Sequence, residues 1–168
     1  MIERFAPEVR GKLLYDEPMV GHTSWKIGGA ADMLFEPADL DDLSKVLQAL
    51  PEDIPLTWIG NGSNLLVRDG GIRGLVIKLA DSLSHIERIS TDTLRIEAGA
   101  TLTHLVRLML DEELLGLEFL AGIPGTVGGA LQMNAGAFED AVWNHVKRFE
   151  LIDRQGERSW IDAVMFTP

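Results

Sequence analysis

Cysteine is absent from the 168-residue sequence, which excludes disulfide bridges, thiolate metal sites and cysteine nucleophiles. Basic residues are also few: 15 lysines and arginines stand against 26 aspartates and glutamates, and the net charge is −11 at pH 7. Binding of nucleic acid requires a basic surface, so we expect no nucleic acid partner. No apolar run approaches the ~20 residues that span a membrane, and the N-terminus lacks an apolar signal core. These absences together predict a cytoplasmic protein with no membrane partner.

Glycine, in contrast, is concentrated in two short segments. The first reads Gly60-Asn61-Gly62-Ser63-Asn64, and the second, residues 122–137, contains five glycines and no charged residue. Glycine allows left-handed backbone conformations in which consecutive N–H groups converge on an anion, and asparagine tolerates them. Two such segments in one chain predict a nucleotide that carries a diphosphate.

Neither segment has one of the common phosphate-binding signatures. The dinucleotide fingerprint of the Rossmann fold would need glycine at position 65, which is leucine, and no Gly-Lys-Ser/Thr of a P-loop occurs. Simpler interpretations stay open: a tight turn between strands for the first segment, and close packing of small residues for the second. The four histidines lie on separate predicted elements without ligand spacing, so we expect no metal site.

The order of apolar and polar residues predicts an α+β protein. Hydrophobic residues make up 46% of the chain, enough for a folded core. Asp39 is placed to cap a helix over 40–50, and Thr101 or Thr103 to cap another that ends before Gly116. A third helix is expected to begin at 130–134. Strands are expected at 31–37, 56–59, 65–67 and 75–79, with hairpins at 84–98 and 146–161. We divide the chain into a lead-in of residues 1–21, a first lobe of 22–80 and a second lobe of 81–168.

Three motifs then occur in order, Thr23–Gly29, Gly60–Val67 and Gly116–Ala130. Together they resemble the UDP-N-acetylenolpyruvoylglucosamine reductase (MurB) family of bacterial cell-wall enzymes, from about residue 21 to 161. The resemblance implies a two-lobed FAD-binding fold of the p-cresol methylhydroxylase and vanillyl-alcohol oxidase type. It also implies that NADPH reduces the flavin, which then reduces UDP-N-acetylglucosamine enolpyruvate to UDP-N-acetylmuramate for peptidoglycan synthesis.

The resemblance also implies which residues line the FAD site. The first loop would wrap the diphosphate, and the second loop and an Asn-Ala-Gly-Ala stretch would lie along the cofactor. No histidine falls within either loop, so we expect non-covalent FAD. The implied cofactor-binding residues are Gly60, Asn61, Gly62, Ser63, Asn64, Leu65, Ile123, Gly125, Thr126, Gly128, Gly129, Ala130, Asn134, Gly136 and Ala137.

The chain departs from the family in two respects. Glu139 stands where the family has glycine. The family's substrate-contacting tyrosine and arginine would follow Phe166, and its proton-donating serine belongs to a C-terminal substrate domain that we expect to be absent. We therefore assign no catalytic residue, and expect an incomplete second lobe and no turnover by the chain alone. Two alternatives stay open: an oxidase of the same flavin fold, and a non-catalytic or truncated nucleotide-binding module.

Overall fold

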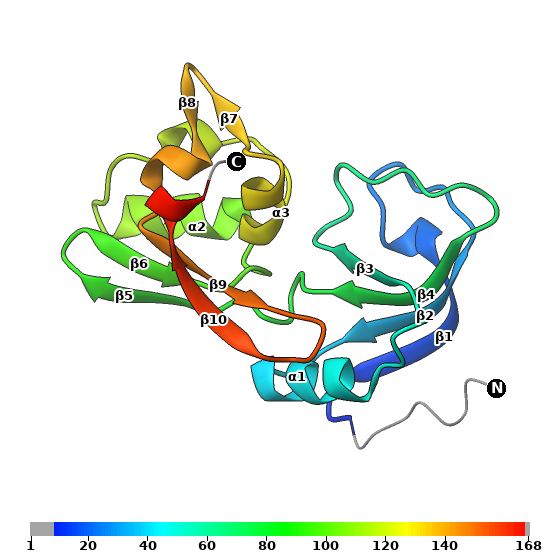
Figure 1. Ribbon diagram of the computed structural model, residues 1–168. Coiled ribbons are helices and arrows are strands. Elements are labelled where there is room, and N and C mark those ends of the chain that lie inside the picture. Colours follow the sequence, from blue (N-terminus) through cyan, green and yellow to red (C-terminus); the bar gives the residue numbers. More distant parts are fainter. Residues whose placement is uncertain (1–8, 167–168) are drawn as a thin grey trace.

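The computed structural model describes residues 9–166, which form two groups of elements side by side (Figure 1). The first group is a four-stranded sheet with one helix: β1 (Lys12–Pro18), β2 (Ala30–Glu36), α1 (Leu40–Ala49), β3 (Leu56–Ile59) and β4 (Ile72–Lys78). The second group contains two helices and three hairpins: β5 (Ile86–Ser90), β6 (Thr93–Ile96), α2 (Leu102–Asp111), α3 (Val127–Gln132), β7 (Gly136–Ala137), β8 (Asp140–Ala141), β9 (Arg148–Ile152) and β10 (Arg158–Asp162). Short 3-10 turns lie at Met19–Gly21, Glu118–Leu120, Val142–His145 and Ala163–Met165.

The four-stranded sheet is buried on both faces. Its order is β1-β2-β4-β3, with β1 antiparallel to β2 and the other neighbours parallel. Met33 and Phe35 of β2 pack with α1 on one face, whereas Ala31 and Leu34 belong to the cluster on the other. The pairing of β2 with β4 is irregular between Ala31 and Met33, where β4 contains one residue more than β2.

The N-terminal end of α1 is tied to the segment before β1 by a buried carboxylate. Asp39 caps the helix as predicted, and its side chain accepts a hydrogen bond from the Asp42 N–H at 2.8 Å. The carboxylate of Asp42, fully buried, accepts the N–H groups of Arg10, Gly11 and Ala38 at 2.9, 2.8 and 3.0 Å. The expected lead-in of residues 1–21 thus contains a strand of the sheet. Strand patterning missed it because β1 is an edge strand with mixed exposure.

The second group has its own core beneath the β5–β6 hairpin. Thr101 caps α2 by accepting the His104 N–H at 3.2 Å, one of the two caps that the sequence suggested. Buried α2 residues, including Leu102 and Leu105, then pack against Phe119 and Leu120 of the following turn. Both predicted hairpins, at 84–98 and 146–161, are confirmed.

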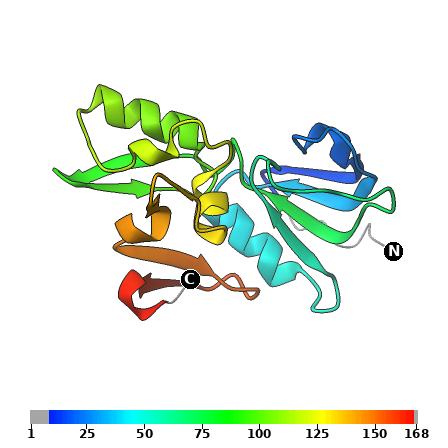
Figure 2. The same cartoon turned by 90° about the horizontal axis from the view of Figure 1, so that it is seen from above.

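The β9–β10 hairpin leaves the second group and reaches the first. The Arg154 Nη2 donates to the carbonyls of Pro51 and Ile54, and the backbone at Gly156 lies against that of Ser44 in α1. Seen from above, α1 lies between the first sheet and this hairpin (Figure 2). The division near residue 80 falls between β4 and β5, and as a domain boundary it stays a prediction.

Two expectations about single elements are wrong. Residues 65–67 are no strand: Leu65 and Val67 pack on the face of the first sheet opposite α1, and Gly29 and Gly71 both donate their N–H groups to the Arg68 carbonyl. Helix α3 begins at Val127 rather than near 130, because Thr126 caps it. Across residues 9–166, no helix combines the length and the apolar character needed to cross a membrane.

Candidate functional site

The two glycine-rich loops, far apart in the sequence, touch each other between the two groups of elements. The Ser63 hydroxyl donates to the Pro124 carbonyl at 3.1 Å. A Cβ placed on Gly60 would lie 2.4 Å from the Thr126 Oγ1, so a side chain at position 60 would force the loops apart. The structure therefore brings together the residues that the sequence selected from the first loop and from the start of the second.

The first loop begins at the C-terminal end of β3 and packs against the segment that follows β1. Gly62 has φ +62°, and a Cβ there would lie 2.0 Å from the His22 carbonyl oxygen. The Ser24 N–H donates to the Gly62 carbonyl at 3.1 Å, and the buried Thr23 donates its hydroxyl to the Ile27 carbonyl at 3.2 Å. Only glycine fits at position 62, because the backbone conformation and the close approach both exclude a side chain.

The backbone N–H groups of this loop have no acceptor within the described protein. Among residues 9–166, no N–H from Asn61 to Val67 donates to a backbone carbonyl or to a side chain. Asn61 and Asn64 are exposed, and Ser63 and Leu65 are half-buried. A run of unused N–H groups around a left-handed glycine is the arrangement that binds phosphate oxygens.

The second loop uses its N–H groups differently. Val127 and Gly128 donate to the carbonyls of Ala100 and Ala98, both at 2.8 Å, and the Thr126 Oγ1 accepts the Gly129 N–H at 3.3 Å. Thr126 is 2% exposed, and its hydroxyl is already used as the N-terminal cap of α3. The first N–H groups of this helix are therefore already bonded within the protein and are not free to bind an anion. The glycines of the second loop instead allow close packing of small residues, which is the simpler of the interpretations that the sequence allows.

Close packing also explains the individual glycines of the second loop. A Cβ at Gly128 would lie 2.9 Å from the Cβ of Ala98, whereas Gly125 has φ +141° and lies against the Ser63 side chain. Ile123 is half-buried against the second core, and Ala130 is buried within it. These residues shape the surface that faces the first loop rather than offering it hydrogen-bond donors.

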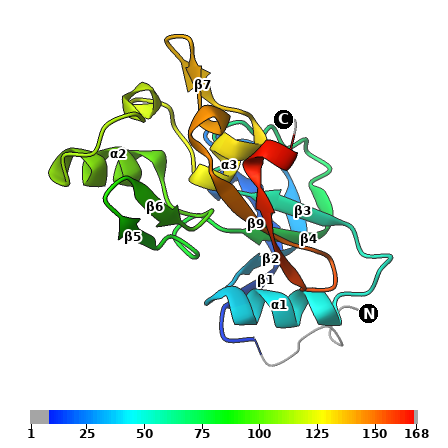
Figure 3. The ribbon, with the colours of Figure 1, turned by 60° about the vertical axis from the view of Figure 1, so that its left-hand side comes forward.

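The third predicted stretch, Asn134–Ala137, lies beyond α3 at the base of a projecting hairpin (Figure 3). Asn134 has φ 44° and is exposed, and Gly136 pairs with Ala141 in the β7–β8 ladder. No hydrogen bond joins this stretch to the first loop within the part of the chain that the structure describes. Asn134, Gly136 and Ala137 thus lie apart from the contact between the two loops, and their part in the site stays a prediction.

The turn of that hairpin contains the departure from the family pattern. Phe138 and Glu139 both have positive φ, 54° and 67°, and Phe138 is 90% exposed. A two-residue turn with both φ angles positive favours glycine or asparagine. Glu139 therefore holds a strained backbone conformation that glycine would adopt freely.

Sequence reasoning missed the support beneath the first loop. Thr23–Gly29 is one of the three motifs of the family, but none of its residues is among the predicted cofactor-binding residues. In the structure, the Gly29 N–H donates to the Arg68 carbonyl, and a Cβ on Gly29 would lie 2.0 Å from the Asp69 carbonyl oxygen. The consecutive glycines at 28 and 29 were the available signal, since such pairs often mark a close approach of two backbones.

Known proteins match this chain over most of its length. The FAD binding domain family model matches residues 31–162. UDP-N-acetylenolpyruvoylglucosamine reductase from Methylococcus capsulatus is 48% identical over 157 residues, 94% of this chain and 52% of the relative. The enzyme of that name from Nitrosococcus oceani is 52% identical over 152 residues, 90% of this chain and 51% of the relative. The chain thus spans about half the length of these curated relatives.

Solved structures show the same fold. The MurB crystal structure from Thermus caldophilus matches with a TM-score of 0.73 and 27% identity, covering 93% of this chain and 53% of that one. The 6-hydroxy-D-nicotine oxidase from Arthrobacter nicotinovorans, at 17% identity and a TM-score of 0.71 over 92% of this chain and 36% of its own, shares the fold alone. The predicted fold class and the predicted family resemblance are both confirmed. The chain belongs to the FAD binding domain family, and its sequence is similar over about nine-tenths of its length to the UDP-N-acetylenolpyruvoylglucosamine reductases.

Proposed function

We propose that this chain is the FAD-holding part of an NADPH-dependent UDP-N-acetylenolpyruvoylglucosamine reductase, and that it binds FAD without a covalent bond. The observation that carries the proposal is the run of unused N–H groups from Asn61 to Val67, in a loop that touches the second loop through Gly60 and Ser63. An anion held by backbone N–H groups needs no basic side chain, which suits a chain with a net charge of −11.

The residues of the chain have distinct roles in this proposal. Backbone N–H groups of the first loop hold the diphosphate, and the exposed amides of Asn61 and Asn64 add hydrogen bonds to it. Ser63 fixes the loop through its bond to the Pro124 carbonyl, so it orients the other donors. The second loop and Asn134–Ala137 provide the remaining walls of the site. When bound, FAD supplies the capacity to accept and donate hydride.

The whole enzyme's activity is proposed from the relatives that carry its name. Those relatives are UDP-N-acetylenolpyruvoylglucosamine reductases, and the chain matches about half of their length. We propose NADPH as hydride donor and UDP-N-acetylglucosamine enolpyruvate as acceptor in the complete enzyme. We expect no turnover by residues 1–168, because no catalytic residue is assigned within them. The cytoplasmic location stays a prediction.

FAD binding by the purified chain tests the proposal. Titration should give saturable binding at one site, and acid denaturation should release all the flavin into the supernatant. Asn64→Asp places a carboxylate beside the diphosphate and should weaken FAD at least tenfold, or about 1.4 kcal/mol. Gln155→Glu adds the same charge in the β9–β10 turn and should leave the affinity within about twofold. A well-folded chain without affinity for FAD, or equal effects of the two variants, would contradict the proposal.

A further inference from the structure

The turn of the β9–β10 hairpin is hydrogen-bonded to the first group of elements through one side chain. The Arg154 Nη2 donates to the Pro51 carbonyl at 2.8 Å and also to the Ile54 carbonyl. Both carbonyls lie in the segment between α1 and β3. The Nε of Arg154 is buried and has no partner among residues 9–166, so a single nitrogen of this guanidinium makes both bonds.

Packing beside Arg154 seats the same turn on the first group. A Cβ on Gly156 would lie 2.6 Å from the Ser44 carbonyl oxygen and 3.2 Å from the Cγ of Gln48, both in α1. Ile152, at the end of β9, packs against the core that α1 forms with the first sheet. The hairpin therefore contacts the first group through main-chain approach, apolar packing and the hydrogen bonds of Arg154.

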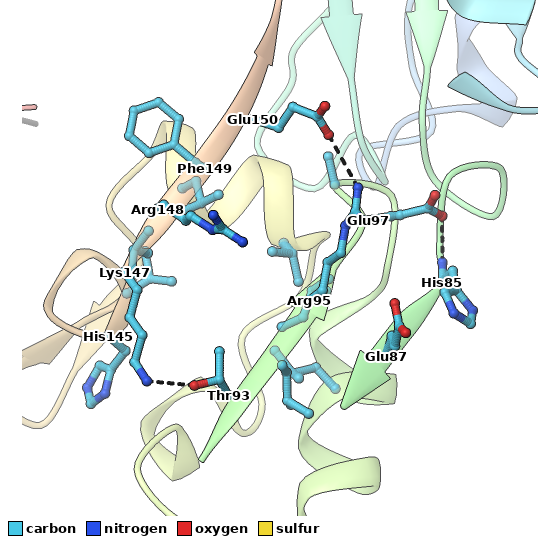
Figure 4. A pocket seen from close by; sticks show the side chains of 18 of the residues that line it. His85, Glu87, Thr93, Arg95, Glu97, His145, Lys147, Arg148, Phe149 and Glu150 are labelled. Carbon is cyan, nitrogen blue, oxygen red and sulfur yellow. Dashed lines mark hydrogen bonds and ion pairs between the residues drawn. The ribbon is translucent and has the colours of Figure 1, made fainter. Parts of the chain in front are cut away.

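The rest of the hairpin is anchored in the second group. An Arg95 nitrogen of β6 lies 3.6 Å from a Glu150 oxygen of β9 (Figure 4). In the short turn that precedes β9, the Trp143 Nε1 donates to the Leu131 carbonyl of α3 at 2.9 Å. The position of the β9–β10 turn on the first group is thus linked through β9 to the position of α3.

These contacts close a ring that contains both glycine-rich loops. On the first group, the ring runs from Ile54 through β3 to Gly60. On the second group, it runs from Arg154 through β9 and α3 to Thr126, the cap of that helix. Arg154 closes the ring at one point, and the contact between the two loops closes it at the other. In a closed ring each joint keeps the partners of the other joint close together, so each lowers the entropic cost of forming the other.

We propose that Arg154 is a positioning residue of the cofactor site, because it holds the two loops at the separation that bound FAD requires. This inference rests on the proposed function, in which FAD lies between the first loop and the second. A ligand that touches both loops binds more tightly when their separation is already fixed, since less conformational freedom is lost on binding. By linkage, FAD stabilises the Arg154 contact by the same factor by which this contact strengthens FAD binding.

Titration of the purified chain with FAD tests one direction of this linkage. Arg154→Met removes the donors and keeps an unbranched apolar side chain, and it should bind FAD about fivefold more weakly than the unaltered chain. Arg154→Lys keeps a single nitrogen that can donate to both carbonyls, so its affinity should stay within about twofold. Arg107→Met makes the matched change at an exposed position of α2 and should also stay within about twofold. Equal affinities of Arg154→Met and Arg107→Met would overturn the proposal.

Limited proteolysis of the unaltered chain tests the other direction. Trypsin should cut after Arg154 when the turn is released from the first group, and at low trypsin the rate follows the population of the released state. Saturating FAD should slow this cut about fivefold, the factor by which Arg154→Met weakens FAD. The cut after Arg88, in β5 and outside the ring, should change by less than about twofold. A rate at Arg154 that FAD leaves unchanged would overturn the proposal.

A double-mutant cycle without FAD tests the ring by itself. Ser63→Ala removes the hydrogen bond from the first loop to the Pro124 carbonyl. Because breaking either joint already frees the ring, Ser63→Ala and Arg154→Met together should destabilise less than the sum of their separate effects. The unfolding constant of the double variant in urea should depart from additivity by about fivefold, whereas Ser63→Ala with Arg107→Met should be additive. Additive effects of Ser63→Ala and Arg154→Met would overturn the ring. A folded, unaltered chain that does not bind FAD would overturn the proposed function, and with it the role of Arg154 toward FAD.

Discussion

The contact between Gly60 and Thr126 predicts a measurable coupling between two residues 66 positions apart. Gly60 has no positive φ, so an alanine there meets no backbone strain, only the Thr126 side chain. Its Cβ would lie 2.4 Å from Oγ1, 3.1 Å from Cγ2 and 3.3 Å from Cβ of Thr126. Thr126 is 2% exposed and cannot turn away freely, so Gly60→Ala should destabilise the chain by about 1–3 kcal/mol.

Thr126→Ala removes the two closest contacts but also the cap of α3. Loss of a threonine cap costs about 1 kcal/mol. In the double variant the remaining approach is the 3.3 Å contact with Cβ, which a small shift relieves. The double variant should therefore lose little more unfolding free energy than Thr126→Ala alone. Relative to additive effects of the two substitutions, the coupling should stabilise the double variant by about 1–2 kcal/mol.

Urea unfolding of the four proteins measures this coupling. A double-mutant cycle requires unchanged m-values, which would show that the compactness of the unfolded state is the same throughout. Gly70→Ala is the matched control, because a Cβ there has nothing within 4 Å, and it should not couple to Thr126→Ala. Additive costs for Gly60→Ala and Thr126→Ala would refute the contact between the two loops.

Three further predictions follow from strained or charged positions. Glu139→Gly should stabilise the chain by about 0.5–1 kcal/mol in thermal unfolding, since φ is 67°, and Glu139→Ala should give no such gain. Burial raises the pKa of Asp42, but the hydrogen bonds that its carboxylate accepts from backbone N–H groups outweigh this effect and hold the pKa below 3.8. The ionised carboxylate therefore stabilises the folded chain above about pH 4, and this stabilisation is lost as the pH falls. Asp42→Asn should lower the free energy of unfolding by about 2–3 kcal/mol at pH 7, measured with urea. A loss that did not become smaller below pH 4 would contradict a stabilising role of the ionised carboxylate. Hydroxyl donors, first that of Ser90, and the Lys147 ammonium lower the pKa of Asp92 to about 2; Lys147→Met should raise it in an NMR titration, and an unchanged value would exclude the ion pair.

The sequence predicted elements well where local chemistry decides them. Asp39 and Thr101 cap their helices because a short polar side chain can reach an N–H three residues on. The two hairpins followed from alternation around polar turns. Local pattern failed at residues 65–67, where the apolar side chains cover a sheet face instead of joining it. Pattern alone cannot distinguish these outcomes, because both bury alternate apolar residues.

For the site, the sequence identified the loops but not the roles of their atoms. Glycine content could not show that the N–H groups of Val127 and Gly128 are already bonded while those after Gly60 are not. That difference depends on Ala98 and Ala100, nearly 30 residues earlier, which no local pattern connects to the loop. The backbone of His22 beneath Gly62 is a long-range contact of the same kind.

The return of the β9–β10 turn to the first group has a consequence for folding. Arg154 donates to carbonyls at Pro51 and Ile54, about 100 residues earlier, and the turn lies on α1. Closing so long a loop is entropically costly, so this contact should form late, after both sheets exist. On the ribosome, the first sheet must therefore exist without this contact until the β9–β10 hairpin has emerged. Its α1 surface is meanwhile open to chaperones or to misassembly.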